Sequence, residues 1–250
     1  DRNIGALSAN MVSTGIDNYG FVYQWGRKDP FFGGDGATNE TADNILSVAR
    51  NNTIVNTGAS WSVNATTGTV DMATKNPMTF ICNSSSSADH PADWLSVSDP
   101  TLWSGTEKTD YDPCPYGYKV PGKNDLVRTL HSAAQTQNDL IYFSYQGRRY
   151  WNYYYYNGGS VTAWPAAGMR QGRNRSALLG NRGAQLLYSG TDADNGSCIY
   201  WTSSPFEIGG NTLSGGSYRI YTSGETLYSE DDYGDNADAY PVRCVKMTNP

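Results

Sequence analysis

The chain has 250 residues, of which 38% are hydrophobic and 13% aromatic, and a formal net charge of -6. This length allows one large domain with its own core. The acidic balance, without any Lys/Arg block, argues against a nucleic-acid partner. No apolar run approaches the roughly 18 residues of a membrane span. The chain opens on Asp1 with neither Met nor a signal peptide, so we expect a mature fragment of a longer protein.

The first half of the chain predicts short strands and two helices between polar loops. An aromatic strand bounded by glycines is expected over 20–26. A short helix is expected over 44–50, and residues 51–110, rich in Asn, Ser, Thr and Asp, predict loops between short strands. The clearest helix is expected over 124–134, with Asn124 as N-cap and Asp125 in the first turn.

The second half predicts strands over 140–145, 150–156, 197–202, 217–221 and 240–246. Fourteen of the nineteen tyrosines lie from Tyr142 onward, and six acids and no base lie over 225–238. Binding loops favour Tyr with small polar residues, because Tyr gives contact area at low entropic cost. We therefore expect a binding loop between Trp201 and Tyr240, with a solvated acidic loop as the alternative. The run from Tyr153 to Tyr156 is a second candidate, for which core packing is the alternative.

The four cysteines are Cys82, Cys114, Cys198 and Cys244. They form no CxxC pair and the chain has only two His, which argues against a zinc site. An even number of Cys in a chain of this composition favours disulfides and an oxidising compartment, and four buried free thiols are the alternative. From the residues alone, all three connectivities stay open.

Five regions of the chain, taken in order, resemble a known family. Their sequences are DRNIGA (1–6), YQWGRKDPF (23–31), DPCPYGYKVP (112–121), AAGMR (166–170) with the later YWTSS (200–204), and PVRCVK (241–246). They resemble motifs of Bacteroidetes surface proteins that carry the Fibrobacter succinogenes major paralogous domain. The resemblance covers nearly the whole chain. It implies one domain over 1–250, the C-terminal part of a longer surface or pilus protein. The implied fold is α+β and C-type-lectin-like, with two helices, small antiparallel sheets and long loops.

The resemblance also implies a disulfide between Cys114 and Cys244, which leaves Cys82 and Cys198 as the second pair. It implies a secreted protein or one on the bacterial cell surface, within a parent pilus or surface assembly. The implied function is that of an adhesin that binds a host or bacterial surface protein or a glycan. The alternative is a structural pilus or surface module that has no ligand of its own.

A second resemblance concerns the candidate binding loop. The lectin-fold variable proteins of diversity-generating retroelements carry their diversified positions between a YWSS-like strand and the final strand, and those positions are rich in Tyr, Asn, Asp and Ser. The same location and residue types occur here. The residues that this resemblance implies as ligand-binding are Ser217, Tyr218, Arg219, Tyr221, Tyr228, Asp231, Asp232, Tyr233, Asp235 and Asn236.

An enzyme is an alternative, because formylglycine-generating enzymes have a fold related to the implied one. The sequence has no GxSxG, HExxH, P-loop or dinucleotide fingerprint, so we expect a non-enzymatic domain without a cofactor. The acids of 225–238 could supply some of the six to eight oxygen ligands of calcium, so a structural calcium stays open. The Glu-Pro-Asn or Gln-Pro-Asp pattern of calcium-dependent lectins is absent, so sugar binding of that type is not expected.

Overall fold

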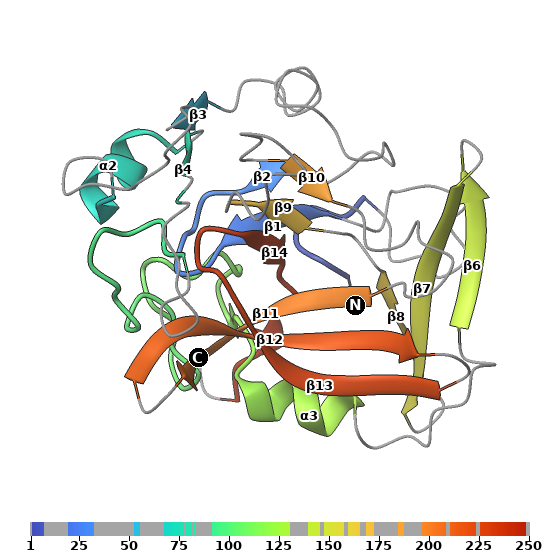
Figure 1. The fold of residues 1–250 in the computed structure, drawn as a ribbon. Coiled ribbons are helices and arrows are strands. Elements are labelled where there is room, and N and C mark those ends of the chain that lie inside the picture. The colour runs from blue at the N-terminus through green and yellow to red at the C-terminus, as the bar shows by residue number, and fades with distance from the viewer. Residues whose placement is uncertain are drawn as a thin grey trace.

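The fold is α+β, and the described residues contain two helices and several small sheets (Figure 1). The computed structural model describes residues 2–7, 20–32, 53–55, 68–77, 79–81, 83, 92–130, 140–145, 148–157, 160–165, 169–172, 185–187, 197–208, 211–223 and 226–248. The helix expected over 44–50 lies outside these residues.

A five-stranded sheet lies at the centre and joins both ends of the chain. Its order is β10 (Gln185–Leu187), β9 (Met169–Gln171), β14 (Ala239–Pro241), β1 (Phe21–Gln24) and β2 (Phe31–Phe32), with antiparallel neighbours. Strand β1 confirms the strand expected over 20–26. The N–H of Ile4 donates to the carbonyl of Val242 at 3.1 Å, so the two ends of the chain run side by side.

Two three-stranded antiparallel sheets come from the second half of the chain. One contains β6 (Leu140–Tyr145), β7 (Arg148–Asn157) and β8 (Ser160–Pro165), and the other β11 (Ser197–Ile208), β12 (Asn211–Ser223) and β13 (Thr226–Gly234). The strands expected over 140–145, 150–156, 197–202 and 217–221 are thereby confirmed, the last two as parts of much longer strands. The strand expected over 240–246 is divided between β14 and β15 (Val245–Lys246).

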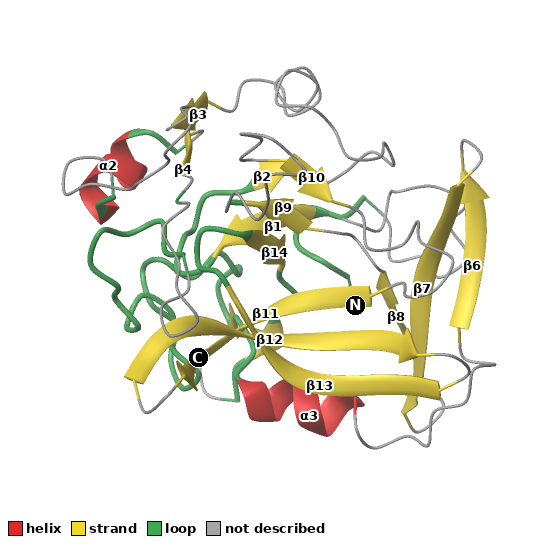
Figure 2. Ribbon diagram, viewed as in Figure 1, coloured by secondary structure: helices red, strands yellow, loops and turns green. Residues whose placement is uncertain are grey.

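Two short strand pairs complete the described sheets. Strand β15 pairs antiparallel with β5 (Tyr118–Lys119), and β3 (Thr53–Val55) pairs parallel with β4 (Thr79–Ile81). A long loop, green in Figure 2, covers residues 92–117 before β5.

Helix α3 (Lys123–Leu130) begins one residue before Asn124, so the N-cap expected at Asn124 is wrong. Gly122 takes that place, because its N–H donates to Asp125 Oδ2 at 2.9 Å while its carbonyl accepts from the Asp125 N–H. The N–H of Lys123 donates to Ser204 Oγ of β11 at 2.9 Å. These two side chains satisfy the first turn and fix the helix against β11. The expected extension over 131–134 lies outside the described residues.

Helix α2 (Val70–Lys75) lies in a stretch that was expected to be loop, so that part of the expectation is wrong. Thr69 caps it, with Oγ1 accepting from the Met72 N–H at 3.0 Å. Ala73 is its buried residue and packs with Trp94 and Leu102. Tertiary packing of this kind stabilises a helix too short to form alone.

The core is built from tryptophans that also hydrogen-bond through their indole N–H groups. Trp25 Nε1 donates to the carbonyl of Thr202 at 2.9 Å, and Trp94 Nε1 to the carbonyl of Trp25 at 2.8 Å. Trp201 Nε1 donates to the carbonyl of Tyr23 at 2.6 Å. All three rings are buried, so each combines a large apolar area with a satisfied polar group. Trp25 and Trp201 join the β1 segment to β11, and this connection positions the candidate site.

One disulfide is present among the described residues and confirms the implied Cys114–Cys244 pair. Its Cα atoms are 5.8 Å apart and it closes a sequence separation of 130 residues. Cys82 lies outside the described residues, so the Cys82–Cys198 pair stays a prediction. A structural disulfide is typical of proteins from oxidising compartments. In the described part of the chain, no helix has the length and apolar character needed to cross a membrane.

Candidate functional site

The stretch between Trp201 and Tyr240 is mostly strand, so the expectation of a long loop is wrong there. Strand β13 occupies 226–234, where the acid-rich loop was expected, and pairs with β12 without interruption (Figure 1). Strand β12 in turn pairs with β11, with irregularities near Trp201 and Phe206. The partner strand satisfies the backbone groups of the acidic segment, which a loop would leave to water.

The sheet register brings predicted binding residues together as cross-strand neighbours. Tyr218 lies opposite Asp231, and Tyr221 lies opposite Tyr228. The remaining pairs place Ser217 opposite Asp232, Arg219 opposite Glu230, and Gly216 opposite Tyr233. Residues that stand directly opposite on antiparallel strands are the closest neighbours in a sheet. The side chains of Tyr218, Arg219, Tyr221, Tyr228, Asp231, Asp232 and Tyr233 lie outside the described part of the structure, so their ligand contacts stay predictions.

Three of the predicted binding residues are buried, and for these the expected exposed position is wrong. They are between 2 and 4% exposed: Ser217, Asp235 and Asn236. Asn236 Oδ1 accepts from the N–H of Gly215 at 2.6 Å, and Asp235 Oδ1 accepts from the N–H of Ala92 at 2.9 Å. Buried backbone donors need such acceptors wherever no regular strand supplies one. The side chains of Asp235 and Asn236 therefore hold the base of the sheet, whereas the buried Ser217 Oγ has no hydrogen-bond partner among the described residues.

Asp93 is the centre of this polar network and was missed in the sequence. Its carboxylate accepts from the N–H of Leu95 at 2.9 Å, from Ser98 Oγ at 2.7 Å and from Asn236 Nδ2 at 2.9 Å. Burial raises the pKa of Asp93 above its ordinary 3.8, although these three hydrogen bonds act in the opposite direction. The sequence signal was weak: one acid between Ala92 and Trp94, both of which are buried.

The raised pKa of Asp93 predicts a pH dependence of stability. The folded chain holds the Asp93 proton more tightly than the unfolded chain, whose value is 3.8. The contribution of Asp93 to the free energy of unfolding should therefore rise as the pH falls through the folded pKa toward 3.8. We expect the unfolding free energy of the native chain minus that of Asp93→Asn to become more positive from pH 7 to pH 4 in urea titrations.

The exposed Asp110→Asn variant controls for the general effect of removing one negative charge. If the unfolding free energy of the native chain minus that of Asp93→Asn becomes more negative on acidification, the assigned direction of the pKa is contradicted.

Three glycines let core rings and the backbone of β11 come close to the base of the β11–β13 sheet. A Cβ on Gly215 would lie 2.2 Å from a ring atom of Trp25, and a Cβ on Gly234 would lie 2.5 Å from the ring of Tyr240. A Cβ on Gly216 would lie 2.4 Å from the carbonyl oxygen of Ser204. Neither rings nor backbone can yield at these distances, so only glycine fits. The sheet is therefore fixed closely to the core at this end.

A second buried charge, Arg27, joins the segments around the central sheet. Its Nε and Nη2 donate to Asp29 Oδ2 at 3.2 and 2.7 Å, and its Nη1 donates to Gln24 Oε1 at 2.9 Å and to the carbonyl of Thr79 at 2.8 Å. Its guanidinium also lies over the ring of Phe31, 5.0 Å from the centroid. Burial lowers the pKa of Arg27, and the neighbouring Asp29 carboxylate acts against that shift.

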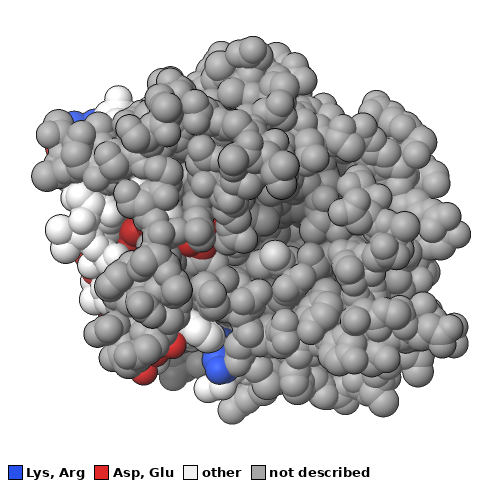
Figure 3. All heavy atoms as spheres, in the orientation of Figure 1, with Lys and Arg blue, Asp and Glu red and all other residues white. Residues whose placement is uncertain are grey.

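Metal binding has no support in the described part of the chain, where no group of three or more His, Cys, Asp or Glu side chains could hold an ion. The buried acids Asp93, Asp235 and Asp238 are engaged with protein donors instead. Asp238 Oδ1 accepts from the N–H of Gly172 at 2.7 Å. On the face drawn in Figure 3, the described acidic and basic side chains form small separate groups.

The chain was compared with family models, curated proteins and solved structures. No family model, no curated protein and no solved structure matches this chain.

Proposed function

We propose that this chain is a non-enzymatic ligand-binding domain of a bacterial surface or pilus protein, and that it binds a protein or glycan through β12 and β13. The observation that carries the proposal is the register of these strands, which makes the tyrosines and aspartates of two separate segments cross-strand neighbours. Tyr is enriched among the few residues that dominate binding energy at interfaces, because it combines contact area with a polar group.

The base of the sheet supports the same proposal. Gly215 and Gly234 pack against core rings, and Asn236 and Asp235 are tied to buried backbone. A binding surface gains affinity when its scaffold is rigid before the ligand arrives, because less conformational entropy is then lost. An anchored base with a Tyr- and Asp-rich strand pair beyond it has this arrangement.

The fold that we propose is C-type-lectin-like. Its support is the pair of helices, the small antiparallel sheets and the adjacent chain ends, together with the ordered sequence motifs. The location that we propose is outside the cell, and the Cys114–Cys244 disulfide supports an oxidising compartment.

The test is an array of glycans and surface proteins probed with the isolated domain. We expect at least one ligand, and we expect replacement of Tyr228, Asp232 and Tyr233 together by Ala to weaken its binding at least tenfold. A loss of this size corresponds to about 1.4 kcal/mol or more, which is modest for tyrosines at an interface.

The matched control replaces three exposed residues far from β13 in the sequence: Asp71, Lys75 and Val97. This variant should keep the native binding profile. If the β13 triple variant also keeps it, or if no ligand is found, the structural-module alternative is favoured.

A further inference from the structure

Two cavities adjoin on a part of the surface that belongs to neither β12 nor β13. The first has a volume of about 320 Å³ and lies between the segment after β1, helix α2 and Tyr111. The second has a volume of about 420 Å³ and lies between the 107–110 segment, Tyr116 and Met247. Lys28 and Asp110 line both cavities, so the two share a boundary. Each falls in the range of about 300–1,000 Å³ that is usual for ligand sites.

The two cavities share two lining residues and repeat two residue types. Each contains one tyrosine and one threonine besides the shared Lys28 and Asp110. The first has Tyr111 and Thr74, and the second has Tyr116 and Thr109. A repeat of one set of groups in two neighbouring cavities suits a ligand made of repeated units.

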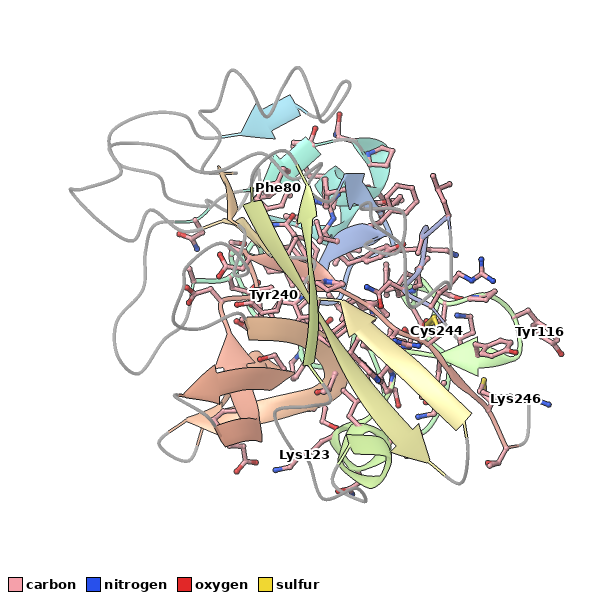
Figure 4. All side chains as sticks on the ribbon, turned by 90° about the vertical axis from the view of Figure 1, so that its right-hand side faces the viewer. Phe80, Tyr116, Lys123, Tyr240, Cys244 and Lys246 are labelled. Atoms are coloured by element: carbon pink, nitrogen blue, oxygen red, sulfur yellow. A yellow bond between two sulfur atoms is a disulfide. The ribbon has the colours of Figure 1, made fainter. Side chains whose placement is uncertain are left out.

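Tyr116 is held by a fixed backbone although its ring is exposed. The side chain is 87% exposed and extends away from the body of the domain at the right-hand edge of Figure 4. Its turn is closed by the Tyr118 N–H, which donates to the carbonyl of Pro115 at 3.0 Å, and by the Met247 N–H, which donates to the carbonyl of Gly117 at 2.9 Å. The Cys114–Cys244 disulfide ties the same turn to the last strand. The fixed backbone keeps this ring at the surface, where its face can stack on a ligand.

The charged side chains at the boundary of the two cavities are of both signs. Within the described part of the chain, the side chains of Lys28, Glu107 and Asp110 make no hydrogen bond or ion pair. Lys108, by contrast, is bound to Asp112 Oδ1 at 3.0 Å and serves the loop structure. An anionic ligand would be repelled by Glu107 and Asp110, and a cationic ligand by Lys28. A neutral ligand with many hydroxyl groups can accept from the ammonium and donate to the carboxylates at the same time.

We propose that these cavities form a binding site for an uncharged oligosaccharide of at least two sugar units, one unit in each cavity. The apolar face of one unit stacks on Tyr111 and that of the next on Tyr116, and the hydroxyl groups between them bind Lys28 and Asp110. This site is separate from the proposed β12–β13 surface, whose strands lie on the opposite side from Tyr116 in Figure 4.

The experiment is a titration of the ¹⁵N-labelled domain by two-dimensional NMR, with maltotriose, cellotriose, chitotriose, mannotriose, xylotriose and lactose as probes. We expect at least one of these sugars to shift the amide signals of 26–29 and 107–117. We expect Tyr111→Ala and Tyr116→Ala each to weaken that sugar at least tenfold. The matched control is Tyr118→Ala, because Tyr118 is 41% exposed and close in sequence but lines neither cavity. It should bind as the native domain does.

Three results would overturn the proposal. They are no shift with any probe, shifts that persist unchanged in the Tyr111→Ala and Tyr116→Ala variants, and shifts confined to residues outside both cavities. Replacement of Tyr228, Asp232 and Tyr233 should leave this sugar binding unchanged, so the two sites can fail independently.

Discussion

Removal of the Cys114–Cys244 disulfide should lower the free energy of unfolding by about 5 kcal/mol in the chain-entropy model of cross-links. The bridge restricts a loop of 130 residues in the unfolded chain, and it ties the turn before α3 to the last strand in the folded one. We expect the double variant Cys114→Ser/Cys244→Ser to unfold at a correspondingly lower urea concentration than the native chain.

The same measurement in a reducing agent tests the second pair. Reduction should destabilise the native chain, and it should destabilise the double variant further only if Cys82 and Cys198 are bridged. An unchanged double variant would contradict the Cys82–Cys198 prediction. A native chain that is insensitive to complete reduction would contradict a stabilising role for Cys114–Cys244.

Replacement of Arg27 by Ala should cost about 3–5 kcal/mol, the range for breaking a buried ion pair by removing one partner. The guanidinium is almost wholly buried, and its loss leaves Gln24 Oε1 and the carbonyl of Thr79 without this donor. Gln24 itself spans two segments, since its Nε2 donates to the carbonyls of Ile81 and Ala237, each at 2.7 Å. We expect the loss to loosen β4 and the segment before β14 together, and urea unfolding measures it.

The neighbouring Lys28→Ala variant is the control, because Lys28 is exposed and makes no ion pair with a described residue. It should change the free energy of unfolding by less than about 0.5 kcal/mol. Arg27→Lys should recover only part of the loss, because an ammonium cannot reproduce the planar set of donors that reaches three partners. An Arg27→Ala variant as stable as Lys28→Ala would contradict the structural role of the buried charge.

Within single sequence motifs, some residues belong to the core and others to the adjoining cavities. The segment 23–31 supplies Arg27 to the core and Lys28 to the adjoining cavities, so neighbouring residues of one motif have opposite environments. The segment 112–121 likewise contributes buried Asp112 and Cys114 to the fold and exposed Tyr116 to the second cavity. Asp112 organises its loop by accepting from the N–H groups of Cys114 and Val120 at 2.7 and 2.9 Å.

The local residue pattern was sufficient to predict several strands and one helix. Strand β1, between two glycines, and strands β6 and β7, rich in aromatic residues, formed where the residue pattern placed them. The main body of α3 also formed as expected, since its apolar spacing is a property of the segment itself. The cysteine pair at 114 and 244 followed from the resemblance of the ordered motifs and not from residue spacing.

Only the tertiary structure decided which polar residues are buried and which segments pair. An acid-rich segment became β13 because β12 offered it a complete hydrogen-bonding partner, and no local pattern contains that information. Asp235 and Asn236 have the composition of a binding loop, yet they are inside because buried N–H groups of Ala92 and Gly215 needed acceptors. Conversely, Tyr111 and Tyr116 become parts of adjoining cavities only when the chain brings Lys28 beside them. Burial and pairing depend on partners distant in the chain, and this is why the sequence predicted a tyrosine-rich binding region but not the surface that presents it.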